Sequence, residues 1–105
     1  MASTKEYLDY VLEQLRDLEE VTYRPMMGEY ILYYQGKVFG GIYDDRFLVK
    51  DTLAVQRLTP NAGGELPYEG AKSMRAPDID DRELMKILIP EIVKDLGNRK
   101  QKNER

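Results

Sequence analysis

The N-terminal residues show a helical pattern of apolar and polar positions. Ser3-Thr4-Lys5-Glu6 matches a capping box, in which the Ser hydroxyl accepts a hydrogen bond from the third helical N–H and Glu reaches back. The apolar residues that follow recur every three or four positions: Tyr7, Leu8, Val11, Leu12, Leu15 and Leu18. This spacing predicts an amphipathic helix of about four turns that ends near Leu18 to Glu20.

The period then changes to that of strands. Runs rich in aromatic and branched residues predict strands at 21–24, 29–34, 37–43 and 46–50. Pro25, which cannot donate to a ladder, is expected to stop the first of them, before a turn or bulge at Met26-Met27-Gly28. Gln35-Gly36 and Asp44-Asp45 are the expected two-residue hairpin loops. The last three strands therefore form an antiparallel meander, and the first is expected to join its edge.

The second half of the chain reads as two helices separated by a loop. Asp51 is the expected cap of a short helix over 52–58, and the Pro, Asn and paired Gly of 59–72 indicate a loop. Residues 73–76 could add a short edge strand. A second capping box at 80–83 opens a helix with apolar positions to Leu96, kinked or split at Pro90 and ended by Gly97.

The element order α-β-β-β-β-α-(β)-α predicts a two-layer α+β fold with helices packed on an antiparallel sheet. Tyr30, Leu32 and Tyr34 alternate with Ile31 and Tyr33, so both faces of this strand are apolar. Either tyrosines cover the face that helices leave free, or another molecule supplies a second layer. The Gly40-Gly41 pair within a strand indicates close approach of a ligand or partner, tight packing of a helix, or a bulge.

Composition removes several classes of chemistry. The chain has 105 residues, enough for one domain, with no His and no Cys. Without them there is no disulfide framework, Ser–His or Cys–His catalysis, or conventional zinc site. The acidic run at Asp78, Asp80 and Asp81 lacks the glycine and distal Glu of a calcium loop, and helix capping is favoured over a metal site. We therefore expect no catalytic residues, metal or cofactor.

Charge divides the chain into two parts. The net charge is −3, but residues 97–105 carry +3, which leaves −6 for residues 1–96. The predicted organisation is one domain over 1–96 and a disordered basic tail over 97–105. Because the body is acidic and repels phosphate, we do not expect it to bind nucleic acid directly. No apolar run is long enough for a membrane span and no secretory signal is recognised, so a cytoplasmic location is expected.

Tyr, Arg and Met gather around the Met-Met-Gly corner, and these residue types are enriched at the centres of protein interfaces. The candidate contact surface is Arg24, Met27, Glu29, Tyr30 and Tyr33. Core and edge packing of the same residues is the competing interpretation. Homodimerisation is a further expectation if the second sheet face is apolar.

Several motifs in order resemble the N-terminal domain of the TfoX (Sxy) family: Tyr23 to Tyr30 with its Met-Met-Gly corner, Lys37 to Tyr43, Phe47 to Lys50, Leu66 to Gly70, and Met74. The resemblance runs from the first helix to about Leu96. It implies a two-layer α+β fold grouped with secretion-chaperone-like domains. Founding members regulate natural competence in bacteria, are thought to act with a cyclic-AMP receptor-type transcription activator, and carry a second, helical domain that is not found in these 105 residues.

The resemblance transfers no catalytic residue. The leading hypothesis is a non-catalytic regulatory or protein-interaction domain with a protein partner, which the resemblance suggests is a transcription-regulatory protein. The alternative is a small enzyme or ligand-binding domain that uses Tyr, Arg and carboxylates. A deep pocket lined by such residues would favour this alternative.

Overall fold

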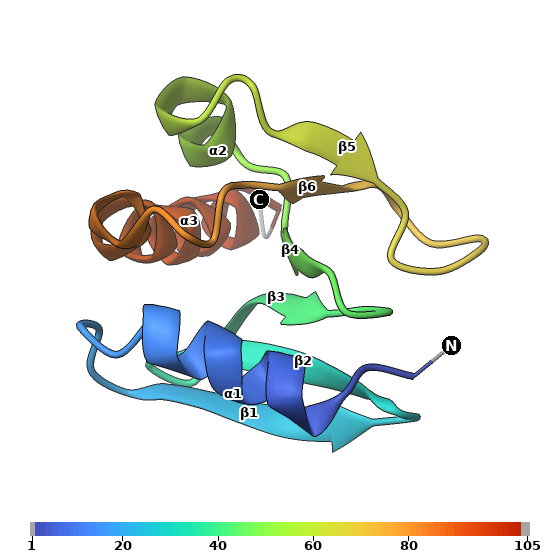
Figure 1. Ribbon diagram of the computed structural model, residues 1–105. Coiled ribbons are helices and arrows are strands. Elements are labelled where there is room, and N and C mark those ends of the chain that lie inside the picture. Colours follow the sequence, from blue (N-terminus) through green and yellow to red (C-terminus); the bar gives the residue numbers. More distant parts are fainter. Residues whose placement is uncertain (1, 104–105) are drawn as a thin grey trace.

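The computed structural model describes residues 2–103, with the side chains of residues 2–97. In chain order its elements are α1 (Lys5–Gln14), β1 (Val21–Met26), β2 (Glu29–Tyr34), β3 (Lys37–Ile42), β4 (Phe47–Val49), α2 (Leu53–Leu58), β5 (Gly63–Glu65), β6 (Met74–Ala76) and α3 (Arg82–Asn103). These strands form one antiparallel sheet of six, in the order β1-β2-β3-β4-β6-β5. The predicted α+β fold, with helices on an antiparallel sheet, is confirmed (Figure 1).

Tight turns with left-handed backbone connect the strands of the meander. Gln35 and Gly36 have φ of 52° and 81°, and Asp44 and Asp45 both have φ of 54°. Two successive positive φ values are the signature of the two-residue hairpin turn that matches strand twist. The predicted hairpin loops are therefore confirmed. β1 lies at the sheet edge beside β2, as predicted, and contains Pro25 rather than ending before it, because an edge strand tolerates one missing donor.

Several predicted boundaries are wrong. α1 ends at Gln14, and Leu15 and Leu18 follow it in turns, although they still pack on or against the core. The caps of α1 and α2 are Thr4 and Thr52, whose hydroxyls accept from the N–H of Tyr7 and Val55. Each threonine has the extended backbone of an N-cap. This backbone geometry lets the hydroxyl accept from a helical N–H, and it falls one residue after the position that the sequence motif indicated.

The second half differs from the prediction at two further places. Gly63–Glu65, expected to be loop, pairs with β6 as the outer strand, so β6 lies inside the sheet. α3 is a single helix that passes both Pro90, where a kink or a split was expected, and Gly97, where an end was expected. The helix is therefore not split at Pro90. Its capping residue is one position later than predicted: the Asp81 carboxylate, not that of Asp80, accepts from the N–H of Leu84. Most side chains of the predicted basic tail, residues 97–105, lie outside those that the structure describes, so the tail stays a prediction.

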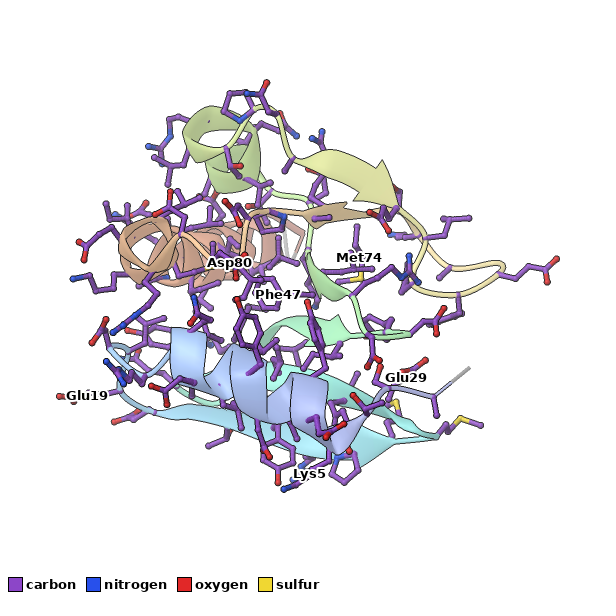
Figure 2. All side chains as sticks on the ribbon, viewed as in Figure 1. Lys5, Glu19, Glu29, Phe47, Met74 and Asp80 are labelled. Atoms are coloured by element: carbon purple, nitrogen blue, oxygen red, sulfur yellow. The ribbon has the colours of Figure 1, made fainter. Side chains whose placement is uncertain are left out.

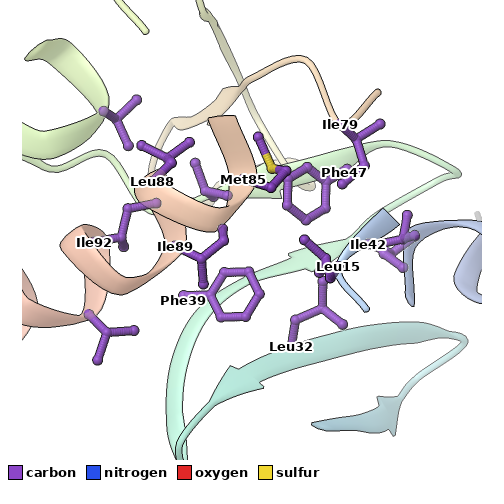
Figure 3. Packing of buried hydrophobic residues seen from close by; sticks show 14 of the residues in the cluster. Leu15, Leu32, Phe39, Ile42, Phe47, Ile79, Met85, Leu88, Ile89 and Ile92 are labelled. Atoms are coloured by element: carbon purple, nitrogen blue, oxygen red, sulfur yellow. The ribbon is translucent and has the colours of Figure 1, made fainter. Parts of the chain in front are cut away.

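The core lies between one face of the sheet and the two long helices. Phe39 of β3 and Leu32 of β2 meet Ile89 of α3 in the middle of this layer (Figure 3). α1 adds Leu8, Val11 and Leu15 from the other side. α2 packs on α3 at the end of the layer, where Asp95 of α3 accepts from the N–H of Ala54 at 2.8 Å. The helices thus pack on one face of the sheet.

Candidate functional site

Strand alternation sorts the side chains of the meander onto two faces. Leu32 points into the helix-covered core, so its neighbours Ile31 and Tyr33 point the other way. On β4, Phe47 and Val49 belong to the core, and Leu48 between them lies on the opposite face. We call this opposite side, carrying Ile31, Tyr33, Val38, Tyr43 and Leu48, the open face.

The open face has an aromatic and cationic edge on β1 and β2. Register places Arg24 opposite Ile31 and Thr22 opposite Tyr33, so Arg24 and Tyr33 are diagonal neighbours. The Arg24 guanidinium carbon lies 5.9 Å from the centre of the Tyr33 ring, within cation–π range. Arg24 is exposed and Tyr33 is half-buried. A flat cation on an aromatic ring is therefore presented at the surface.

A groove lies farther across the open face, beside the loop that joins β5 to β6. Its volume is about 710 Å³. In Figure 2, Met74 lies toward the loop that joins β5 to β6, and Phe47 lies toward α1 and α3. The lining comes from β3, the end of β4, the loop and α3: Val38, Gly40, Tyr43, Lys50, Asp51, Pro67, Tyr68, Ala71, Lys72, Ser73, Met74 and Leu96.

Gly40 and Gly41 bring the strands together beneath the groove. A Cβ at Gly40 would lie 2.9 Å from the Val49 Cα and still closer to the carbonyl oxygen of Leu48. A Cβ at Gly41 would lie 2.7 Å from both the Tyr30 carbonyl oxygen and the Tyr43 ring. The register of β2 and β3 shifts at Leu32/Tyr33, which leaves Phe39 as the extra residue of a bulge. Of the interpretations left open, the bulge is present. Close approach by neighbouring strands, which was not among them, also accounts for this glycine pair.

The aromatic end of the groove is formed by Tyr43 and Tyr68. Their ring centres lie 6.3 Å apart with an interplanar angle of 56°. Burial raises the pKa of Tyr43 above its ordinary value, and the nearby Tyr68 and Glu29 act in the same direction. At neutral pH the Tyr43 phenol is therefore protonated, and it can donate a hydrogen bond but is a poor base.

The family of the chain is decided by comparison with known sequences. The family model described as the TfoX N-terminal domain matches residues 13–86. This chain belongs to the TfoX N-terminal domain family. Over 78 residues it is also 36% identical to an uncharacterized 12.7 kDa protein in the trpE 5′ region of Spirochaeta aurantia, a match that covers 74% of this chain and 68% of that protein.

In this TfoX N-terminal domain, the five residues of the predicted contact surface do not all lie together. Arg24 and Tyr33 lie together on the open face. Tyr30 lies on the other face, where its ring meets that of Tyr23 edge-on at 5.8 Å. Met27 stands at the β1–β2 turn and is 96% exposed. The surface as a whole stays a prediction, with Arg24 and Tyr33 as its connected part.

Glu29 has a structural role in the TfoX N-terminal domain. Its Oε1 accepts from the Ser3 hydroxyl at 2.5 Å and from the N–H of Asp44 at 3.1 Å. Asp45 in turn accepts from the N–H of Thr4 at 2.8 Å and donates its own N–H to Ser3 at 3.0 Å. These bonds tie the start of α1 to two hairpin ends, and we call the set Ser3, Thr4, Glu29, Asp44 and Asp45 the latch (Figure 2 labels Glu29).

Sequence reasoning missed the groove. Lys50 and Lys72 are 22 positions apart, and no local pattern links them; pairing of β4 with β6 brings their segments together. Among the described residues, no group of three or more His, Cys, Asp or Glu side chains is arranged to hold a metal ion. Asp78 and Asp81 instead accept from backbone N–H groups at the start of α3. In the same part of the chain, none of the helices is long and apolar enough to cross a membrane.

Proposed function

We propose that this TfoX N-terminal domain is a non-catalytic regulatory domain that binds a transcription-regulatory protein through Arg24 and Tyr33. The observation that carries the proposal is the Arg24–Tyr33 pair on a sheet face that the helices leave uncovered. Arg and Tyr are the residue types that most often dominate binding energy at interfaces.

The chemistry of the pair indicates what the partner surface offers. The guanidinium is held over the ring with its donors exposed, and no ion pair satisfies it among the described side chains. A partner carboxylate beside an apolar group would match this arrangement, because Arg binds carboxylates through two parallel hydrogen bonds. The expected partner therefore presents an acidic residue next to apolar side chains.

The test is a binding measurement with a purified partner. The first candidate is a cyclic-AMP receptor-type transcription activator from the same organism, titrated calorimetrically with the wild-type domain and with Arg24→Ala and Tyr33→Ala. We expect each substitution to weaken binding about tenfold or more. Tyr10→Ala is the matched control, since Tyr10 is an exposed tyrosine on α1.

Two results would count against the proposal. Equal binding by the wild type and both variants would place the interface elsewhere. A stable dimer by light scattering that Tyr33→Ala dissociates would show that a second copy of the chain covers this face instead. If the first candidate does not bind, partners captured from lysate are purified and enter the same titration.

A further inference from the structure

The groove adjoins the Arg24–Tyr33 pair, because Val38 of its lining is the cross-strand partner of Tyr33, and it has the dimensions of a small-molecule site. Its volume of about 710 Å³ lies within the range of roughly 300–1,000 Å³ that is typical of ligand pockets. β4 is antiparallel to β3, and the N–H of Lys50 donates to the Phe39 carbonyl at 2.9 Å. Lys50 and Val38 are therefore near one end of the groove, and Tyr43 is near the other.

Two lysines of the groove have no counter-charge within the described part of the chain. Elsewhere seven cations each pair with a carboxylate: Lys5, Arg16, Arg46, Arg57, Arg75, Arg82 and Lys86. Among the described residues outside the groove, Arg24, Lys37 and Lys94 make no ion pair. Lys50 and Lys72 both line the groove and make no such pair with the described side chains. Asp51, the acid in the lining, holds the guanidinium of Arg75 at 3.3 Å. Within the described part of the chain, two ammonium groups of the groove are thus outside any ion pair.

The lysines are near neighbours along the wall of the groove. Val49 is paired with Arg75, so continuing this antiparallel register by one residue sets Lys50 opposite Met74. Lys72 lies two residues before Met74, in the segment that leads into β6, and both residues line the groove. Ser73 lies between these positions in the lining, and its hydroxyl donates to the Met74 carbonyl oxygen at 3.4 Å. This wall offers donors and positive charge to an anionic group.

The remaining lining suits an apolar or planar body. The tilted rings of Tyr43 and Tyr68 stand at one end, and Val38, Pro67 and Met74 supply apolar surface between. Gly41 has no side chain, so the Tyr43 ring can lie against the strand. We propose that the groove binds a small organic anion, with its carboxylate or phosphate at Lys50 and Lys72 and its aromatic or apolar body against Tyr43 and Tyr68.

The test is a titration of the isotopically labelled full chain, followed by amide NMR. The probes are benzoate and phenyl phosphate, with benzyl alcohol as the neutral analogue of the same size. We expect saturable shifts at Val38, Ala71 and Met74 with the anions and much weaker binding of the alcohol. Comparison of the two anions shows whether the groove takes the carboxylate or the phosphate.

Variants then locate the anionic group. Lys50→Gln and Lys72→Gln are each expected to weaken anion binding about fivefold, since a partly exposed charge pair contributes modestly. Lys94→Gln removes an exposed lysine of α3 outside the groove and should bind as wild type. The spectra report folding directly, and Lys50→Arg should keep binding if Lys50→Gln does not fold.

Three outcomes would overturn the inference. They are the absence of groove shifts at millimolar anion, equal binding of benzyl alcohol, and unchanged anion binding in both Gln variants. Shifts produced by a short polyglutamate peptide but by neither small anion would also reject it and assign the groove to an acidic protein segment. None of these outcomes bears on the Arg24–Tyr33 contact, which is tested with different variants and a different partner.

Discussion

The two faces of one sheet are built from alternate residues of the same strands, yet they differ in nearly every physical respect. On the covered face, Leu32 and Phe39 are fully buried beneath α1 and α3. On the open face, Leu48 is buried, Ile31, Tyr33 and Val38 are only half-buried, and Arg24 and Lys50, which make no ion pair with the described side chains, are exposed. Burial of apolar area stabilises the fold, whereas exposed aromatic and cationic groups suit recognition. Substitutions on the two faces should therefore affect different measurements.

The largest expected effect is at the centre of the covered face. Phe39 has no exposed surface and packs near Ile89 and Phe47 (Figure 3). Phe39→Ala should lower the free energy of unfolding by about 3–5 kcal/mol, through lost burial and the cavity that remains. Tyr33→Ala on the open face should lower it by about 1 kcal/mol or less. Urea denaturation followed by circular dichroism measures both; equal losses would mean that the open face also carries the fold.

The next effect concerns the glycine pair beneath the groove. Gly40→Ala places a Cβ against backbone atoms of Leu48 and Val49, which cannot move aside without shifting β4. We expect a loss of about 1–3 kcal/mol, the usual range for overpacking. Gly97→Ala is the matched control, because nothing lies within 4 Å of its Cβ position in α3. That substitution should stabilise the domain by up to ~1 kcal/mol. A harmless Gly40→Ala would show that β3 and β4 approach less closely.

The covered face was more predictable from sequence than the open one. Helical spacing and strand alternation assigned Leu8, Leu32 and Phe47 to elements that the structure confirms, because burial imposes a period on the chain. The Gly63-Gly64 pair shows no sequence pattern typical of a strand. These residues form a strand only because they pair with β6. Lys50 and Lys72 likewise meet only through the β4–β6 pairing. Long-range pairing leaves no local pattern, so the groove could not be found from sequence.

A smaller effect is expected at the latch, which ties the start of α1 to two hairpin ends. Glu29→Ala removes the acceptor of both the Ser3 hydroxyl and the Asp44 N–H. The unfolding free energy should fall by about 1–2 kcal/mol, as for partly exposed bonds to a charged group. Hydrogen exchange should quicken at Asp44 and at the start of α1 but not in α3. Glu69→Ala, at an exposed loop position, is the control and should change neither measurement.

Uniformly faster exchange in Glu29→Ala would contradict a local latch. In that case Glu29 would support the whole domain, and the sheet edge would be no less stable than the core. Ser3→Ala provides a second reading, because it removes the donor to Glu29 and the acceptor of the Asp45 N–H while leaving the carboxylate in place.

The smallest expected effect is the dependence of stability on pH through the contact between the segment after α1 and the start of α3. Arg82 donates to the Asp17 carboxylate at 2.7 Å, and this hydrogen bond lowers the pKa of Asp17 below its ordinary value of 3.8. Because the folded-state pKa is depressed, the stabilisation is fully present above about pH 4 and is lost as pH falls through the folded value. Asp17→Asn should therefore lower stability at neutral pH and flatten the decline on acidification. Urea midpoints measured from neutral pH to about pH 2 would show this. Arg82→Gln and the double variant should share the flatter slope. Parallel curves for wild type and Asp17→Asn would mean that the Asp17–Arg82 contact does not stabilise the packing of the segment after α1 on the start of α3, which would then rest on apolar packing and on the hydrogen bond from Gln14 to the Ile79 carbonyl.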